Sequence, residues 1–193
     1  MPKKLKIVSS PPEEINIKNR GTGAGGSNTN KNGLPYEELT DLNDRLTIIK
    51  KNKFCDIIKF NGNEKLFSKT KQANLFKYMK DEINKNIEKA HGCKNPDECY
   101  IDEESKNMFI IEKKFQQTSG SVCEKIQGAP FKREHYSRTF PNYNIIYIYC
   151  FSEWFKKNCI AELEYLDFKN IPYFCGDSKT FKDDIINFII NYK

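Results

Sequence analysis

Two carboxylates and a lysine are spaced along the chain so that they could support hydrolysis of a phosphodiester bond. Asp97 precedes an apolar run at 98–102, and Glu112 and Lys114 lie near the end of a second run at 108–115. Side chains at 112 and 114 share one face of a strand, because successive residues alternate between its two faces. Two neighbouring carboxylates repel each other unless a cation lies between them, and Mg²⁺ is commonly held in this way. A lysine beside such a metal can stabilise the charge of an attacking hydroxide, so this group predicts metal-dependent hydrolysis.

The two apolar runs predict a β-hairpin, and its register decides which side chains meet. If the turn is centred between residues 105 and 106, Asp97 faces Lys114 and Cys99 faces Glu112 across the ladder. Opposed side chains on one face lie about 5 Å apart, so Asp97, Glu112 and Lys114 converge, whereas a register error of one residue would separate them. Asp102 would lie roughly 10 Å further along the strand and is rejected. The alternative is an exposed hairpin with a Glu–Lys cross-strand pair.

The remaining elements predict an α/β fold with a mixed central β-sheet flanked by helices. Besides the hairpin, apolar runs bounded by turn residues predict strands at 54–60, 144–151 and 171–175. The run at 144–151 is continuously apolar, which is typical of a central strand buried on both faces. Helical periodicity and capping signals predict helices at 35–50, from Ser68 to Gly92, from about Ser119, from Ser152 and at 181–192.

Length and charge limit the class of protein. The 193 residues suit a single domain at 34–193 behind an N-terminal arm at 1–33, which carries a Gly/Asn-rich segment. Lys and Arg total 32 against 26 Asp and Glu, and the net charge of +6 permits a polyanionic partner without requiring one. We expect a cytoplasmic protein with no membrane partner, because the sequence has no bilayer-spanning apolar run and no signal-peptide core.

The cysteines offer a further, weaker possibility. Their number, seven, is odd, so we expect reduced thiols that serve mostly as small buried hydrophobic groups. His91, Cys93 and Cys99 suggest zinc, but their spacing matches no standard zinc site.

The pair Pro96-Asp97, followed fifteen positions after Asp97 by Glu112-Lys113-Lys114, resembles the motif of the PD-(D/E)XK nuclease superfamily. This is the fold of most type II restriction endonucleases. The stretch at 109–127, Phe-Ile-Ile-Glu-Lys-Lys-Phe-Gln-Gln-Thr-Ser-Gly-Ser-Val-Cys-Glu-Lys-Ile-Gln, resembles that group more closely, and the resemblance extends over about residues 20–155. It implies a restriction-endonuclease-like core and a sequence-specific endodeoxyribonuclease that uses Mg²⁺, for which Mn²⁺ substitutes. It also implies double-stranded DNA as the partner and a homodimer that matches a symmetric DNA site.

The resemblance assigns a role to each residue of the motif. Asp97 and Glu112 match the metal-binding carboxylates, the main-chain carbonyl of Lys113 matches a further metal ligand, and Lys114 matches the catalytic lysine. Many members carry another glutamate on the first helix after an aromatic residue. Glu37, which follows Tyr36, matches that pattern.

Polar and basic residues on either side of the motif are expected to contact DNA. Glycines allow backbone amides to approach a phosphate closely, and Asn and Thr can bind phosphate oxygens or base edges. The expected contacts are Ser27, Asn28, Thr29 and Asn30 in the arm, Gln116, Ser119 and Ser121 after the second strand, and Lys125, Lys132 and Arg133. Two alternatives stay open: a structure-specific repair or junction-resolving nuclease of the same fold, and a non-catalytic nucleic-acid-binding module.

Overall fold

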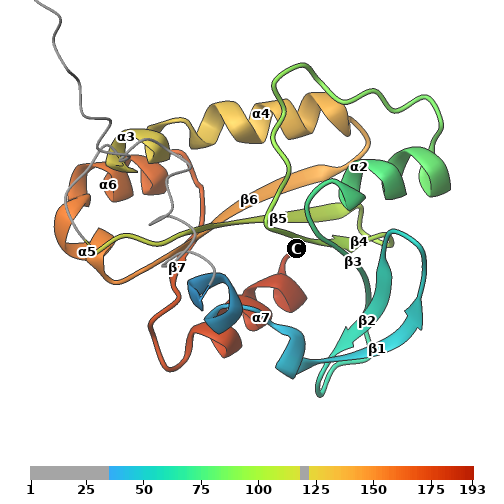
Figure 1. Cartoon of the computed structure of the whole chain (residues 1–193), viewed down its shortest axis with the longest axis horizontal. Coiled ribbons are helices and arrows are strands. Elements are labelled where there is room, and N and C mark those ends of the chain that lie inside the picture. The colour runs from blue at the N-terminus through green and yellow to red at the C-terminus, as the bar shows by residue number, and fades with distance from the viewer. Residues whose placement is uncertain (1–34, 118–121) are drawn as a thin grey trace, which may run out of the picture.

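A computed structural model describes residues 35–117 and 122–193, and within them the chain forms a seven-stranded mixed sheet (Figure 1). The strands lie side by side in sequence order, and the first five are antiparallel while β5, β6 and β7 are parallel. Their bounds are β1 (Leu46–Lys51), β2 (Asp56–Phe60), β3 (Leu66–Thr70), β4 (Glu98–Asp102), β5 (Asn107–Lys114), β6 (Asn144–Phe151) and β7 (Tyr173–Cys175). The predicted α/β class with a mixed sheet is therefore confirmed.

Helices cover both faces of the sheet, and each face has its own apolar core (Figure 1). One core joins the sheet to α2, α3, α4, α5 and α6, and the other joins it to α7 and a helical turn at 35–39. The helices are η1 (Asn43–Arg45), α2 (Asn74–Tyr78), η2 (Met79–Ile83), α3 (Val122–Gln127), α4 (Ala129–Thr139), α5 (Trp154–Asn158), α6 (Ile160–Phe168) and α7 (Phe181–Asn191).

The strand at 144–151 has the bounds that the sequence predicts. Every residue of β6 except Asn144 is buried, and the strand lies between β5 and β7. A strand covered on both faces must be apolar at consecutive positions, which is why its pattern is so clear in the sequence.

Two helix predictions are wrong in the N-terminal half. The helix expected at 35–50 ends at 39, and Leu46–Lys51 instead forms strand β1, where Thr47 and Ile48 are β-branched and pair with β2. Ser68 does not cap a helix but lies inside β3, because Asn61-Gly62 forms a turn that returns the chain along β2. Helical structure follows only at 74–83, so strand pairing overrides the local helical periodicity.

Two further differences concern the C-terminal half. Ser152 does not cap the following helix; its hydroxyl group bonds the main-chain N–H and carbonyl of Gln116 instead. The sequence does not predict helix α4. Charged and aromatic residues are distributed around the whole helix, so it has no clear apolar stripe.

The prediction of reduced cysteines is confirmed for five residues and is wrong for Cys123 and Cys159. Cys123 and Cys159 form a disulfide, because α3 and the junction of α5 with α6 bring their Cα atoms to 5.7 Å. Cys55, Cys93, Cys99, Cys150 and Cys175 are free, and all but Cys175 are buried. Of the helices that the structure describes, none has the length and apolarity needed to cross a bilayer.

Candidate active site

The β4–β5 hairpin forms as predicted, but with a register that differs by two residues. Cys99 pairs with Ile110 and Glu98 with Ile111, so the next pair outward along the ladder is Asp97 and Glu112. The expected pairing of Cys99 with Glu112 is therefore wrong. Because the shift is an even number of residues, Asp97 and Glu112 still lie on the same face.

Asp97 lies where the chain enters β4, held against β5. Its Oδ2 atom accepts a hydrogen bond of 2.7 Å from the main-chain N–H of Lys113. Asp102, at the other end of β4, instead accepts hydrogen bonds from the turn residues Glu104 and Ser105 and pairs with Lys65 at 2.6 Å. These contacts give Asp102 a structural role, in agreement with its rejection from the sequence.

Two lysines from different elements converge on Glu112. The Nζ atom of Lys114, two residues along β5, lies 2.6 Å from Glu112 Oε1, and the Nζ atom of Lys132, from α4, lies 3.2 Å from the same oxygen. The Glu112 side chain is only 13% exposed, so both ion pairs are partly shielded from water. The sequence placed Lys132 among the DNA contacts, but its approach to Glu112 depends on the packing of α4 against the sheet.

The two carboxyl groups differ in their proton affinity. Burial raises the pKa of Asp97, and the neighbouring Glu112 carboxylate raises it further. Burial would also raise the pKa of Glu112, but the ammonium groups of Lys114 and Lys132 outweigh it and hold this pKa below its usual range. The site therefore contains one acid that is stabilised as the anion and one that needs a further cation.

The helical turn at 35–39 brings Glu37 to the same end of the hairpin. Tyr36 anchors this turn: it is buried, its ring lies 5.2 Å from that of Phe115, and its hydroxyl group contacts the Cys150 thiol. The Lys113 ammonium donates a hydrogen bond of 3.0 Å to the main-chain carbonyl of Glu37. The Glu37 carboxylate is close enough to contribute to the raised pKa of Asp97, so Glu37 adds negative charge to the site.

Two of the three oxygen donors that the sequence nominates as metal ligands, the Glu112 carboxylate and the Lys113 carbonyl, converge on the Lys114 ammonium. The Nζ atom of Lys114 lies 2.6 Å from Glu112 Oε1 and 3.2 Å from the main-chain carbonyl oxygen of Lys113. Carboxylate and carbonyl oxygens are hard donors that suit Mg²⁺, which commonly uses one or two carboxylates and retains several waters. The donor set of Asp97, Glu112 and the Lys113 carbonyl therefore fits this ion.

Opposite the carboxylates, the other face of the same hairpin carries a charge network in which Glu98 and Lys113 are buried and Lys71 and Asp41 are partly exposed. Glu98 and Lys113 are 2% and 3% exposed and form an ion pair of 3.0 Å. Lys71 lies 3.3 Å from Glu98 and 2.5 Å from Asp41. The sequence nominates Lys113 only through its main-chain carbonyl and does not single out Glu98. The available signal was a charged residue within each of two apolar strands.

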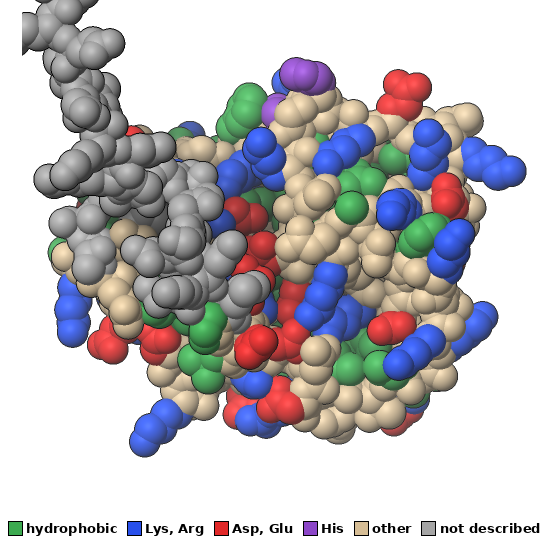
Figure 2. Space-filling view, viewed as in Figure 1, with side chains coloured by type: hydrophobic (Ala, Val, Ile, Leu, Met, Phe, Trp, Pro, Cys, Tyr) green, Lys and Arg blue, Asp and Glu red, His purple; other side chains and the backbone are tan. Residues whose placement is uncertain are grey.

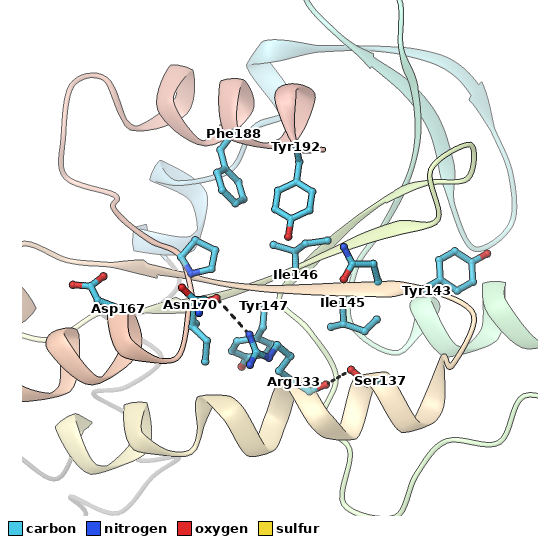
Figure 3. A pocket seen from close by; sticks show the side chains of 13 residues that line it. Arg133, Ser137, Tyr143, Ile145, Ile146, Tyr147, Asp167, Asn170, Phe188 and Tyr192 are labelled. Atoms are coloured by element: carbon cyan, nitrogen blue, oxygen red, sulfur yellow. Dashed lines mark hydrogen bonds between the residues drawn. The ribbon is translucent and has the colours of Figure 1, made fainter.

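The other residues that the sequence predicts as DNA contacts do not lie together in the part of the chain that the structure describes. Lys125 is exposed on α3, and the main chain of Gln116 is bound by Ser152. Arg133 donates to the carbonyls of Lys169 and Asn170 at 3.3 and 3.4 Å and lines a cavity of about 660 Å³ beside the first half of β6, where Figure 3 shows it beside Asn170. Ser27, Asn28, Thr29, Asn30, Ser119 and Ser121 lie outside the described residues.

The surface in Figure 2 shows how the charges are arranged. Acidic side chains form a band across the middle of this face, and Lys and Arg side chains lie beside it. A phosphate backbone would be repelled by the acids alone, so the flanking cations are the groups suited to hold it.

Soft metal ligands gather elsewhere. Within residues 35–117 and 122–193, three His, Cys, Asp or Glu side chains converge at Cys123, Cys159 and Glu162 and nowhere else. The two sulfur atoms of that group form the disulfide. The zinc set considered from the sequence, with His91, does not converge among these residues.

Comparisons with protein-family models, with curated proteins and with solved structures each gave no match.

Proposed function

We propose that the protein is a metal-dependent endonuclease that hydrolyses phosphodiester bonds in duplex DNA, built on a restriction-endonuclease-like core. The observation that carries the proposal is the group of Asp97, Glu112 and Lys114 at one end of the β4–β5 hairpin, in which Lys114 contacts Glu112 and burial and Glu112 raise the pKa of Asp97. Acids held this close need a cation, and a lysine beside them suits chemistry on a phosphate.

Each side chain has a distinct task in this proposal. Asp97, Glu112 and the carbonyl of Lys113 hold Mg²⁺, or Mn²⁺ in its place, and the metal supplies Lewis-acid activation when bound. Lys114 orients the attacking water and stabilises negative charge on the phosphate as the P–O bond breaks. Lys132 holds Glu112 ionised and offers a second cation to the phosphate oxygens. Glu37 adds negative charge near Asp97.

The partner and the assembly follow from charge and symmetry. The excess of six positive charges and the exposed Lys125 favour a polyanion such as DNA. A sequence-specific type II enzyme that cuts both strands of a symmetric site does so most simply as a homodimer, and we propose that assembly here.

The test is incubation of the purified protein with supercoiled plasmid, with and without Mg²⁺. We expect discrete fragments only with the metal, and Glu112→Gln should abolish them. Glu134→Gln is the matched control, because Glu134 is exposed on α4 and pairs only with Arg138 among the described residues.

Three other results would contradict part or all of this proposal. Cleavage restricted to branched or mismatched DNA would replace sequence specificity by structure specificity. Salt-dependent DNA binding with no metal-dependent cleavage would indicate a non-catalytic binding module. Full activity in Glu112→Gln would remove the proposed site.

A further inference from the structure

A polar cavity of about 340 Å³ lies at the same end of the sheet as Asp97 and Glu112, beside the start of β2 and the end of β3. Its lining is rich in groups that donate hydrogen bonds. Three lysines and three asparagines contribute, namely Lys53, Lys69, Lys71, Asn43, Asn52 and Asn74. Ammonium and amide groups together are typical of a site for an anion that carries several oxygen acceptors.

Lys69 is the unusual member of this lining, because it is buried without a carboxylate. Its residue exposure is 7%, and its ammonium group donates to the side-chain carbonyl of Asn43 and lies 5.7 Å from the centre of the Tyr100 ring. No carboxylate of the described residues pairs with it within 4.0 Å. Buried charges in proteins are normally paired, because removal from water costs several kcal/mol per ion.

The other charges around the cavity do not supply the missing partner. Lys71 is already shared between Asp41 and Glu98. The carboxylates of Glu98 and Asp41 favour the charged form of Lys69, whereas Lys71 and Lys113 oppose it, and burial lowers its pKa overall. Asp56 is the single carboxylate of the lining; it lies opposite Lys69 in the β2–β3 ladder but forms no ion pair of 4.0 Å or less with it. An anion in the cavity would therefore meet a buried ammonium group that has no ion pair of its own among the described residues, with Asp56 as the one acid of the lining.

The strand registers place this cavity at the same end of the sheet as the carboxylates, but Lys69, which pairs with Tyr100, lies on the face of Glu98, opposite to that of Asp97 and Glu112. Thr70 pairs with Cys99 on β4, so Lys71 lies beside Glu98, one position from Asp97. Neighbouring strands are about 5 Å apart, which puts β3 roughly 10 Å from β5. A nucleic-acid strand advances about 3.4 Å along its axis per nucleotide, so a strand that passes around this end of the sheet would bring a phosphate a few nucleotides from the scissile one to the cavity.

We propose that this cavity binds a backbone phosphate of the nucleic-acid substrate, with Lys69 as its buried cation and Lys53 as its cation at the surface. The assignment to a backbone phosphate rests on the proposed function, whereas the phosphate chemistry rests on the cavity alone. Lys53 is exposed and held at 4.8 Å over the Phe54 ring, so it can close over an anion that enters from solvent.

The experiment compares DNA binding by the wild-type protein, Lys69→Met and Lys106→Met, each in EDTA so that no cleavage occurs. Lys69→Met should weaken binding several-fold and reduce the slope of log K against log salt by about 0.9, the value for one phosphate contact. Lys106→Met removes the same charge at the opposite end of the sheet, in the turn between β4 and β5, and should leave affinity and slope unchanged.

A second measurement checks folding and identifies the source of the phosphate. Lys69→Met should melt at the same temperature as the wild type or higher, because it removes a buried, unpaired charge. Inorganic phosphate should raise the melting temperature of the wild type and of Lys106→Met but not of Lys69→Met. Stabilisation by inorganic phosphate with unchanged DNA binding in Lys69→Met would overturn the backbone assignment in favour of a free phosphate.

The proposal and the nuclease function fail in different ways. If the wild type does not cleave DNA but Lys69→Met still loses one phosphate contact, the cavity stands and the nuclease function falls. If the wild type cleaves DNA while Lys69→Met retains full affinity, full salt slope and the response to phosphate, the cavity proposal is overturned.

Discussion

Both faces of the β4–β5 hairpin carry acidic residues and lysines, but one face is partly open to solvent and the other is buried. On one face, Asp97 and Glu112 lie together and Lys114 and Lys132 both pair with Glu112, all partly open to solvent. On the other face, Glu98 and Lys113 are almost fully buried and pair directly. Adjacent residues in the chain thus belong to different environments, because strand side chains alternate between faces.

This difference separates a site built for binding from one built for structure. The buried pair satisfies its own charges and joins the turn at 35–39 to the hairpin through the Glu37 carbonyl. The open group leaves Asp97 with a raised pKa, which is a cost that the folded protein carries without gaining stability. Unfavourable electrostatics of this kind are typical of functional sites.

The largest effects are expected from removal of a lysine ammonium group, that of Lys114 on the open face and that of Lys113 on the buried face. Lys114→Met should lower the single-turnover cleavage rate about 100- to 1,000-fold, because it removes a group that stabilises developing charge. Its unfolding free energy should change by only about 1 kcal/mol, because Lys114 is partly exposed.

Lys113→Met should have its main effect on the unfolding free energy and not on the cleavage rate. Breaking a buried ion pair typically costs about 3–5 kcal/mol, so we expect a large fall in the unfolding free energy measured with urea. Equal losses of stability in the two variants would contradict the distinction between the faces. The double variant Glu98→Gln/Lys113→Met should lose less than the sum of the single changes, by about 1–3 kcal/mol.

The next largest effect is on the melting temperature at pH 7, which should rise when Asp97 is neutralised and fall when Glu112 is neutralised. The raised pKa of Asp97 means that its stabilising contribution is present below about pH 4 and is lost as the pH rises through its folded-state value. Asp97→Asn should therefore melt at a higher temperature than the wild type at pH 7 in EDTA, and the gain should vanish at low pH.

Glu112→Gln should behave in the opposite way. Its pKa is lowered in the folded protein, so its contribution is present above its ordinary pKa and is lost as the pH falls through the folded-state value. The variant should melt at a lower temperature than the wild type at pH 7, with the difference disappearing in acid. Thermal shifts of the same sign for both variants at pH 7 would refute the assignment of the two acids.

The smallest expected effect comes from the cation that α4 contributes. Lys132→Met should raise the pKa of Glu112, because one of its two lysine partners is removed, and the change is measurable by carboxyl NMR titration in EDTA. An unchanged titration would show that Lys114 alone controls Glu112. Arg133→Met provides the comparison, because Arg133 is the next residue of α4 and binds main-chain carbonyls instead.

Local sequence patterns predicted those parts of the fold that local physics controls. The hairpin, the strand at 144–151 and the C-terminal helix each carry a strong apolar period, and all three are present. The helix expected from Ser68 failed, because pairing of β3 with β2 and β4 outweighs the helical period there. Local propensity is a weak guide wherever distant strands compete for the same residues.

The sequence by itself determined which residue types are available and which of them share a face of the hairpin. That face assignment survived a register error of two residues, because strand side chains repeat every two positions. Only the tertiary structure decided that Lys132 reaches Glu112 from twenty residues away, that Glu98 and Lys113 are sealed from water, and that Lys69 is buried without a carboxylate. These outcomes depend on how α4, the turn at 35–39 and the strand ends pack together. The charged residues that meet there are far apart in the chain, so no local sequence pattern predicts their contacts.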